Sequence, residues 1–211
     1  MRLAAIILAG GRSTRMGRPK VSLPFGDETL LQRVCRTLAR ATTTLVVVRR
    51  DAAQELGQLP TAAAVTEDLE PGAGPLGGIA AGLRWLRDVA GYAADDAAFV
   101  TACDHPFLQD RAVHALADRI AGFDLVMPNV GEILQPMGAV YRLRVLDAIE
   151  RLLRAGMRTP RSLASATNAK IVTATELATF DPGLGLVRGI NTPEEYAAAL
   201  AELGLPPEST A

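Results

Sequence analysis

The sequence predicts an α/β fold: a single Rossmann-like domain of three layers, in which a mostly parallel sheet carries helices on both faces. Apolar runs of strand length alternate with longer segments whose apolar residues recur at helical spacing, which is the pattern of βαβ units. The 211 residues show no internal repeat and no linker-like stretch. A chain of this length can bury roughly 70% of its unfolded surface, so it needs no disulfide or metal to fold.

The first half of the chain begins with a strand that leads into a glycine-rich loop. Because the apolar run at 3–7 continues directly into this loop, we interpret it as a strand and not as part of a signal peptide. The predicted segments of this half are, in order, strand 3–7, helix 30–38, strand 45–48, strand 62–66, helix 77–89 and strand 97–102.

The second half continues the alternation and ends in a capped helix. Thr192 is a good N-cap, Pro193 suits the first helical position, and Glu195 is spaced as a capping-box partner. We expect the domain to span 1–204 and residues 205–211 to form a loose tail. The predicted segments are helix 111–120, strand 124–127, strand 138–141, helix 145–153, a helix after residue 160, strand 171–173 and a final helix from residue 192.

Charge and composition exclude several classes of partner. With 22 basic and 23 acidic residues the formal net charge is −1, which is unlike proteins whose main partner is nucleic acid or an anionic membrane. No stretch approaches the roughly twenty apolar residues of a membrane span. Cys35 and Cys103 give neither a disulfide framework nor a zinc site, a usage that fits a reducing cytoplasm.

The loop after the first strand has the composition of a phosphate-binding loop. Gly10 and Gly11 can turn the backbone with positive φ and let a ligand approach, so that successive N–H groups point at anionic oxygens. The spacing fits neither a Walker loop nor a dinucleotide-binding fingerprint. The alternative interpretation is that Gly10 and Gly11 form a simple turn and that the cationic side chains after it only face solvent. Four cations stand within nine residues: Arg12, Arg15, Arg18 and Lys20.

Asp104 is a candidate magnesium ligand. It stands where the apolar strand 97–102 has ended, and Pro106 prevents the strand from continuing. Ligands of open α/β sheets lie at the carboxyl ends of the strands, where a carboxylate and substrate phosphates together can hold Mg²⁺. The alternative role is to cap the helix that begins near Gln109. His105 adjoins Asp104 and could touch a substrate.

The segment from Leu8 to Lys20 resembles the N-terminal signature of nucleotidyltransferases that couple a nucleoside triphosphate to a phosphorylated acceptor. Its Ala-Gly-Gly form is similar to that of the molybdenum cofactor guanylyltransferases. Three further motifs follow in that family's order: an Asp and Gly-Pro-Leu-x-Gly loop at Asp68, Cys-Asp-x-Pro at Asp104, and Asn-Thr-Pro-Glu at Asn191. The resemblance implies the fold of the nucleotide-diphospho-sugar transferases.

The resemblance also implies roles for particular residues. Asp68 could instead belong to an ordinary glycine-rich loop, and Asn191 could serve only the helix start. The family often carries another Asn where Gly189 stands, so that ligand is lost or replaced here. The implied catalytic residues are Lys20, Arg15 and Asp104; the GTP-binding residues are Leu8, Ala9, Gly10, Gly11, Lys20, Asp68 and Asp104; the metal ligands are Asp104 and, more weakly, Asn191.

The activity that the resemblance implies is magnesium-dependent transfer of GMP from GTP to the terminal phosphate of molybdopterin. Transient contact with cofactor-delivery proteins or molybdoenzyme chaperones is a further implied partnership. We expect Gly10 to favour guanine over cytosine, because the missing Cβ leaves room for a purine. The alternatives are a CTP-dependent cytidylyltransferase of the same cofactor, another small-molecule nucleotidyltransferase, and a non-catalytic nucleotide-binding module. Retention of both Lys20 and Asp104 speaks against the module.

Overall fold

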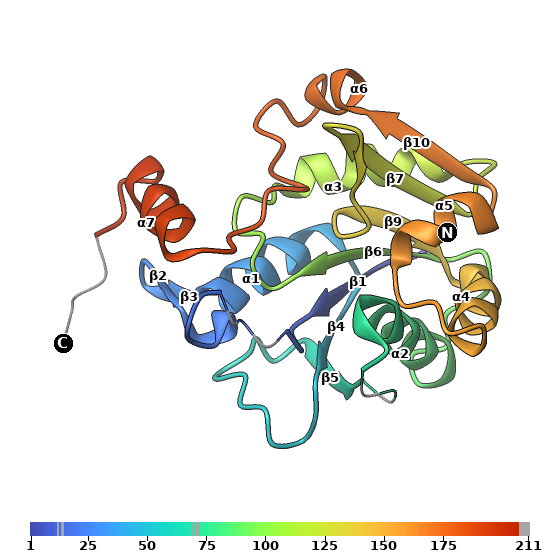
Figure 1. The fold of residues 1–211 in the computed structure, drawn as a ribbon, viewed down its shortest axis with the longest axis horizontal. Coiled ribbons are helices and arrows are strands. Elements are labelled where there is room, and N and C mark those ends of the chain that lie inside the picture. The colour runs from blue at the N-terminus through green and yellow to red at the C-terminus, as the bar shows by residue number, and fades with distance from the viewer. Residues whose placement is uncertain (12, 14, 69, 71, 207–211) are drawn as a thin grey trace.

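A central sheet runs through the middle of the molecule with helices in front of it and behind it (Figure 1). The computed structural model describes residues 1–11, 13, 15–68, 70 and 72–206. The layered α/β arrangement predicted from the alternation of apolar runs is confirmed. Its strands are β1 (Leu3–Leu8), β2 (Pro24–Phe25), β3 (Glu28–Thr29), β4 (Thr44–Arg49), β5 (Ala63–Glu67), β6 (Ala97–Ala102), β7 (Leu125–Val130), β8 (Ile133–Leu134), β9 (Ala139–Arg142) and β10 (Ala169–Thr173).

The main sheet is mostly parallel, and its strand order creates one crevice. The order is β10-β7-β9-β6-β1-β4-β5, with β8 paired to the side of β7. β1 pairs in parallel with both β4 and β6, whereas β9 runs antiparallel between β6 and β7. The chain leaves β1 toward β4 and β5 and later returns on the other side at β6. The carboxyl ends of β1 and β6 are therefore the switch point at which open α/β sheets bind ligands.

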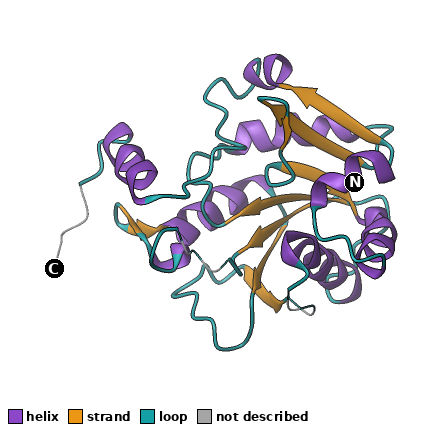
Figure 2. Ribbon diagram, viewed as in Figure 1, coloured by secondary structure: helices purple, strands orange, loops and turns teal. Residues whose placement is uncertain are grey.

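The helices form the two outer layers of the domain (Figure 2). One apolar cluster joins α1 and α3 to one face of the sheet, and a second joins α2 and α4 to the other. Within the described residues, no helix is both long and apolar enough to cross a membrane. The α-helices are α1 (Leu30–Ala41), α2 (Gly74–Asp88), α3 (Asp110–Ala117), α4 (Leu146–Arg154), α5 (Leu163–Ala166), α6 (Ala174–Ala178) and α7 (Pro193–Glu202). The 3₁₀ turns are η1 (Lys20–Ser22), η2 (Asp118–Ile120), η3 (Leu143–Val145) and η4 (Pro160–Ser162).

β1 shows how the two cores divide. Ala5 and Ile7 belong to the cluster beneath α1, whereas Ala4 and Ile6 belong to the cluster beneath α2. This follows from the two-residue period of a strand, which sends successive side chains to opposite faces. On the α2 side the helix comes very near, because a Cβ at Gly82 would lie 2.6 Å from Ile6 Cγ2. Gly82 is therefore required for the close contact between α2 and β1.

The C-terminal helix packs away from the main sheet, against the small hairpin β2–β3 (Figure 1). The two-residue strands β2, β3 and β8 and the five-residue helix α6 were not predicted, because such short elements show no periodicity. Leu205, at the start of the expected loose tail, packs against the apolar cluster formed by α7, the hairpin and neighbouring residues. Its N–H donates to the carbonyl of Leu200 at 2.9 Å. Residues 207–211 of the tail lie outside the described residues. A third apolar cluster holds the unit together: Met16, Leu23, Phe25, Leu30, Ile190, Tyr196, Ala199 and Leu200.

The close contact between α2 and β1 can be tested by overfilling it. Gly82→Val should lower the free energy of unfolding by about 1–3 kcal/mol, because the added atoms must displace the buried Ile6 side chain. Urea denaturation monitored by circular dichroism measures the change. Gly183→Val is the matched control, since no atom lies within 4 Å of a Cβ at that exposed loop position. Equal denaturation midpoints for the two variants would contradict this account of the packing.

Candidate active site

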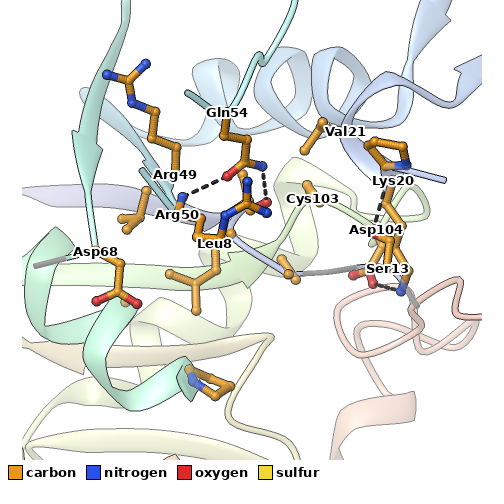
Figure 3. A pocket seen from close by; sticks show the side chains of 18 of the residues that line it. Leu8, Ser13, Lys20, Val21, Arg49, Arg50, Gln54, Asp68, Cys103 and Asp104 are labelled. Atoms are coloured by element: carbon orange, nitrogen blue, oxygen red, sulfur yellow. Dashed lines mark hydrogen bonds and ion pairs between the residues drawn. The ribbon is translucent and has the colours of Figure 1, made fainter. Parts of the chain in front are cut away.

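A cavity of about 570 Å³ opens at the carboxyl ends of β1 and β6. Figure 3 shows Asp68 at one end of it and the Lys20–Asp104 pair at the other, with Gln54 between them. All the residues expected to bind substrate or metal line this one cavity, which is where the strand order places the switch point. They are Leu8, Ala9, Gly10, Gly11, Arg15, Lys20, Asp68, Asp104 and Asn191.

The glycine-rich loop turns at different residues from those expected. Gly10 and Gly11 have no positive φ; the loop instead takes left-handed conformations at Ser13, with φ 50°, and at Gly17, with φ 74°. The Ser13 hydroxyl accepts a hydrogen bond from the Lys20 backbone N–H at 3.2 Å, which ties the two ends of the loop together. Arg12 lies outside the described residues. Arg15 is exposed and borders the cavity, and Arg18 lies over the ring of Tyr196.

Gly10 and Gly11 serve two different purposes. A Cβ at Gly11 would meet no atom within 4 Å, so this position leaves open space beside the cavity. A Cβ at Gly10 would lie 3.2 Å from the backbone N and Cα of Arg50. The expectation that Gly10 directly frees space for a base is therefore wrong. Its missing Cβ lets the loop after β4 approach the loop after β1.

Gln54 fastens these two loops and was not identified from the sequence. Its amide Nε2 donates to the carbonyl of Ala9 at 2.7 Å, and its Oε1 accepts from the backbone N–H of Arg50 at 2.7 Å. The dashed lines in Figure 3 mark these bonds. Gln54 stands in a polar stretch without motif spacing, so no local pattern distinguishes it from a surface glutamine. Both ends of its amide are occupied by backbone groups, which makes it a brace for the cavity wall.

Three segments distant in sequence meet at the Lys20 ammonium. Lys20 Nζ lies 2.5 Å from Asp104 Oδ2 and 3.0 Å from Asn191 Oδ1. The side chains of Lys20 and Asp104 are only 13% and 14% exposed, so solvent screens this ion pair weakly. The carboxylate after β6 and the amide before α7 thus converge on one positive charge beside the glycine-rich loop. The sequence predicts each group separately but not their mutual contact.

The start of α7 places Asn191. The Thr192 hydroxyl accepts from the N–H of Glu195 at 3.2 Å, as expected of an N-cap. The Glu195 carboxylate, however, accepts from the N–H of Asn191 at 2.6 Å, one residue before its expected capping-box partner. The same bond that satisfies the helix start therefore also fixes the backbone of Asn191. The backbone of Asn191 thus joins the start of α7, while its side-chain oxygen accepts from Lys20 Nζ at 3.0 Å; its role as a metal ligand stays a prediction.

Asp68 occupies the far end of the cavity, where β5 ends. Its backbone N–H donates to the carbonyl of Arg49 at 2.9 Å, and its Oδ1 accepts from the N–H of Glu70 at 3.1 Å. Burial raises the pKa of the Asp68 carboxyl above its usual value. The Asp68 carboxylate is therefore partly buried, and among the described residues it accepts from the Glu70 N–H, so a donor group of a ligand could bind it as well.

The remaining reactive side chains near the cavity are buried and uncharged near neutral pH. Burial raises the pKa of the Cys103 thiol, so it is not a thiolate nucleophile. Burial also lowers the pKa of His105, whose ring is therefore neutral. His105 Nδ1 lies 3.2 Å from both the Thr101 hydroxyl and the carbonyl of Leu186. His105 does not line the cavity among the described residues, so the expectation that it could touch a substrate is not supported.

The oxygens at Lys20 suit a hard divalent cation held jointly with a ligand. Among the described residues, no group of three or more His, Cys, Asp or Glu side chains could hold a metal ion. Mg²⁺ does not require such a group, since it binds through one or two carboxylates together with substrate phosphates and water. Asp104 and Asn191 both direct oxygens at one cationic atom, Lys20 Nζ. This donor set fits Mg²⁺ completed by phosphate oxygens.

Solved structures identify the class to which this fold and site belong. Molybdopterin-guanine dinucleotide biosynthesis protein A from Archaeoglobus fulgidus superposes with a TM-score of 0.79 and 26% identity, covering 96% of this chain and 98% of its own. The 2-C-methyl-D-erythritol 4-phosphate cytidylyltransferase of Thermus thermophilus superposes with a TM-score of 0.70 at 18% identity, covering 97% of this chain and all of its own. The fold is that of the nucleotide-diphospho-sugar transferases, as predicted.

The chain belongs to the family of MobA-like NTP transferase domains, whose model matches residues 5–171. The molybdenum cofactor guanylyltransferase of Desulfosudis oleivorans is 32% identical over 203 residues, covering 95% of this chain and 96% of its own. The probable molybdenum cofactor guanylyltransferase of Pelotomaculum thermopropionicum is 36% identical over 155 residues, covering 74% of this chain and 71% of its own. The resemblance to this family seen in the sequence is therefore confirmed. Asn191 lies beyond the matched residues.

Ionisation of the Asp68 carboxyl should lower the free energy of unfolding of the protein. Because its folded pKa is raised, the native state binds the proton more tightly than the unfolded state, and the ionised form is destabilising above the folded pKa. Asp68→Asn should therefore unfold at equal or higher temperature than wild type at pH 7. The difference should shrink as the pH falls toward 4. Calorimetry at a series of pH values measures it, with the exposed Asp147→Asn as control; a lower melting temperature for Asp68→Asn at pH 7 would contradict this account.

Proposed function

We propose that this chain transfers GMP from GTP to the terminal phosphate of molybdopterin, as its molybdenum cofactor, giving the guanine dinucleotide form and pyrophosphate. An acceptor phosphate oxygen attacks the α-phosphorus of GTP, a new P–O bond forms, and the bond from the α-phosphorus to the bridging oxygen of pyrophosphate breaks. The observation that carries the proposal is the meeting of Lys20, Asp104 and Asn191 beside the glycine-rich loop. Relatives along nearly the whole chain are named molybdenum cofactor guanylyltransferases.

In this proposal the triphosphate occupies the Lys20 end of the cavity and the nucleoside the Asp68 end. Support comes from the charged side chains labelled in Figure 3: Lys20, paired with Asp104, lies at the first end and Asp68 at the second. A carboxylate is a suitable acceptor for N–H groups of a base, whereas it would repel phosphates. Leu8, Ala9, Gly10 and Gly11 form the wall between them, where backbone groups can approach the ligand closely.

Lys20 and Arg15 have the electrostatic role. The acceptor brings its own nucleophile, so the protein needs no nucleophilic side chain; its tasks are to align the two phosphates and to offset negative charge on the departing pyrophosphate. Lys20 pairs with Asp104 in the structure. A triphosphate offers Lys20 stronger anionic partners, and its arrival frees the Asp104 carboxylate for other ligands.

We include Mg²⁺ as the cofactor, held by Asp104 and more weakly by Asn191. When bound, the ion supplies positive charge that offsets the charge of the reacting phosphates. Asp104 contributes the anionic oxygen and Asn191 a neutral amide oxygen, and both already lie within 3.0 Å of a positive charge. The Glu195 carboxylate holds the Asn191 backbone and so limits the movement of this second oxygen.

The substrates imply GTP and molybdopterin as partners, and we propose the cytoplasm as the location. Support for the location comes from Cys35 and Cys103, which are both buried free thiols. We also propose that delivery proteins or molybdoenzyme chaperones hand over this cofactor directly. We propose such contacts as transient, at the open face of the cavity.

The proposed reaction is tested by measuring pyrophosphate release with molybdopterin-loaded acceptor and Mg²⁺, with GTP and CTP side by side. Release should require GTP. Asp104→Asn, which keeps an oxygen for Lys20 but removes the charge, should lower kcat by about 10²–10³, and Lys20→Ala should act similarly. Each variant leaves one largely buried charge without its charged partner, so melting temperatures measured in parallel should fall, and turnover is compared at a temperature at which the variants are folded.

Asp147→Asn removes an exposed carboxylate outside the cavity and is the matched control, expected to retain wild-type turnover. Preferential use of CTP would overturn the choice of base. Turnover with neither nucleotide would favour another acceptor, and GTP binding that never yields pyrophosphate would favour a non-catalytic binding module. Normal activity in Asp104→Asn would contradict the proposed site.

A further inference from the structure

His105 lies directly behind the Asp104 carboxylate and has no part in the proposed chemistry. It is 7% exposed and is one of the few buried polar side chains in the described part of the chain. A buried imidazole loses hydration and must find partners within the protein. The partners of its two ring nitrogens lie on opposite sides, and each side has a separate role.

The Nδ1 side anchors the ring to the protein interior. Nδ1 lies 3.2 Å from the carbonyl oxygen of Leu186. Nδ1 also lies 3.2 Å from the Thr101 hydroxyl at the end of β6, so two groups from different segments hold this edge of the ring.

The carbonyl that receives this bond is itself fixed. The buried Asp181 accepts from the N–H of Leu186 at 2.8 Å and from the N–H of Gly185 at 3.1 Å. Gly185 lies against the chain that follows His105, because a Cβ there would be 2.2 Å from the carbonyl oxygen of Phe107. The ring is thus held by a braced loop and cannot readily turn away from Asp104.

The Nε2 side faces the carboxylate. Nε2 lies 3.7 Å from Asp104 Oδ1, while Asp104 Oδ2 contacts Lys20 at 2.5 Å. Gly189 closes the same space: a Cβ there would be 3.0 Å from Nε2 and 3.6 Å from Oδ1. The His105 ring and Gly189 thus lie behind Oδ1 on the buried side, which restricts rotation of the carboxylate and keeps Oδ2 directed at the cavity.

We propose that His105 is a positioning residue that fixes the orientation of the Asp104 carboxylate toward the cation site formed with Asn191. This inference rests on the proposed function, because it assigns to Asp104 the binding of a divalent cation. His105 acts through Asp104 and touches neither substrate nor metal. Its contribution is to spare Asp104 the entropy of ordering its carboxylate when a cation binds.

The competing explanation is that His105 only ties the loop at Leu186 to the end of β6. Asparagine and glutamine separate the two roles, since the amide of Asn lies near the position of Nδ1 and the amide of Gln near that of Nε2. His105→Asn can keep the bond to Leu186 but leaves space beside Oδ1. His105→Gln can keep a polar group beside Oδ1 but loses the bond to Leu186.

The experiment measures Mn²⁺ affinity in the presence of GTP by electron paramagnetic resonance, together with kcat, KM for GTP and melting temperature. His105→Asn should melt close to wild type and bind Mn²⁺ about 10–100-fold more weakly, the range typical of residues that orient metal ligands. Its kcat should fall while KM for GTP changes little. His105→Gln should recover much of the Mn²⁺ affinity despite a lower melting temperature. His114→Asn, on the exposed side of α3, is the matched control and should behave as wild type.

Wild-type Mn²⁺ affinity in His105→Asn would overturn the proposal, as would Mn²⁺ affinities that simply follow the melting temperatures of the two variants. If His105→Asn fails to fold, Gly189→Ala tests the proposal instead. Its methyl group would press on His105 Nε2 and lie near Asp104 Oδ1, while the bond between His105 and Leu186 stays in place. A folded Gly189→Ala with unchanged Mn²⁺ affinity would also overturn it. If wild-type protein binds no Mn²⁺ with GTP, the proposed function itself fails, which is distinguishable from the failure of His105 alone.

Discussion

The Lys20 ammonium, lying between the Asp104 carboxylate and the Asn191 amide, is the interaction on which the arrangement of the cavity depends. It joins the loop after β1, the end of β6 and the start of α7 at one charged atom. Because these side chains are largely buried, removing one partner would leave a charge that solvent compensates poorly. The pair therefore holds the cavity together before any ligand arrives, and anionic phosphate oxygens can replace either acceptor of the Lys20 ammonium.

The sheet makes this meeting possible. Parallel strands present their carboxyl ends at one edge, and the reversal of strand order between β1 and β6 opens that edge as a crevice. Glycines then decide how closely the surrounding layers approach. Gly82 brings α2 against β1, Gly10 brings the loop after β4 against the phosphate loop, and Gly185 brings the segment before α7 against the chain after Asp104. Close backbone contacts at these glycines thus set the shape of the cavity and of the layers behind it.

The fold alone does not choose the reaction. A cytidylyltransferase of 18% identity has the same fold, so base and acceptor must be selected by side chains and loops. Gly10 illustrates the difficulty, since its missing Cβ faces Arg50 and not open space. Any effect of this glycine on base choice must act through the loop that Gln54 fastens. The residues that hold Asp104 and Asn191 in place, His105 and Glu195, similarly act one step behind the cavity.

The sequence by itself determined the alternation of strands and helices and the glycine-rich loop after β1. It also determined that four candidate site residues stand at the ends of elements: Lys20, Asp68, Asp104 and Asn191. These features depend on periodicity, capping and motif spacing within short stretches of the chain. Very short elements such as β2 and β3 could not be predicted, since two residues carry no period. Only the tertiary structure decided that Lys20 contacts residues 84 and 171 positions away in the chain. It also decided that the loop turns at Ser13 and Gly17, that Gln54 braces the wall and that His105 stands behind Asp104. Contacts of this kind depend on which surfaces the packed layers bring together, and no local pattern in the chain encodes them.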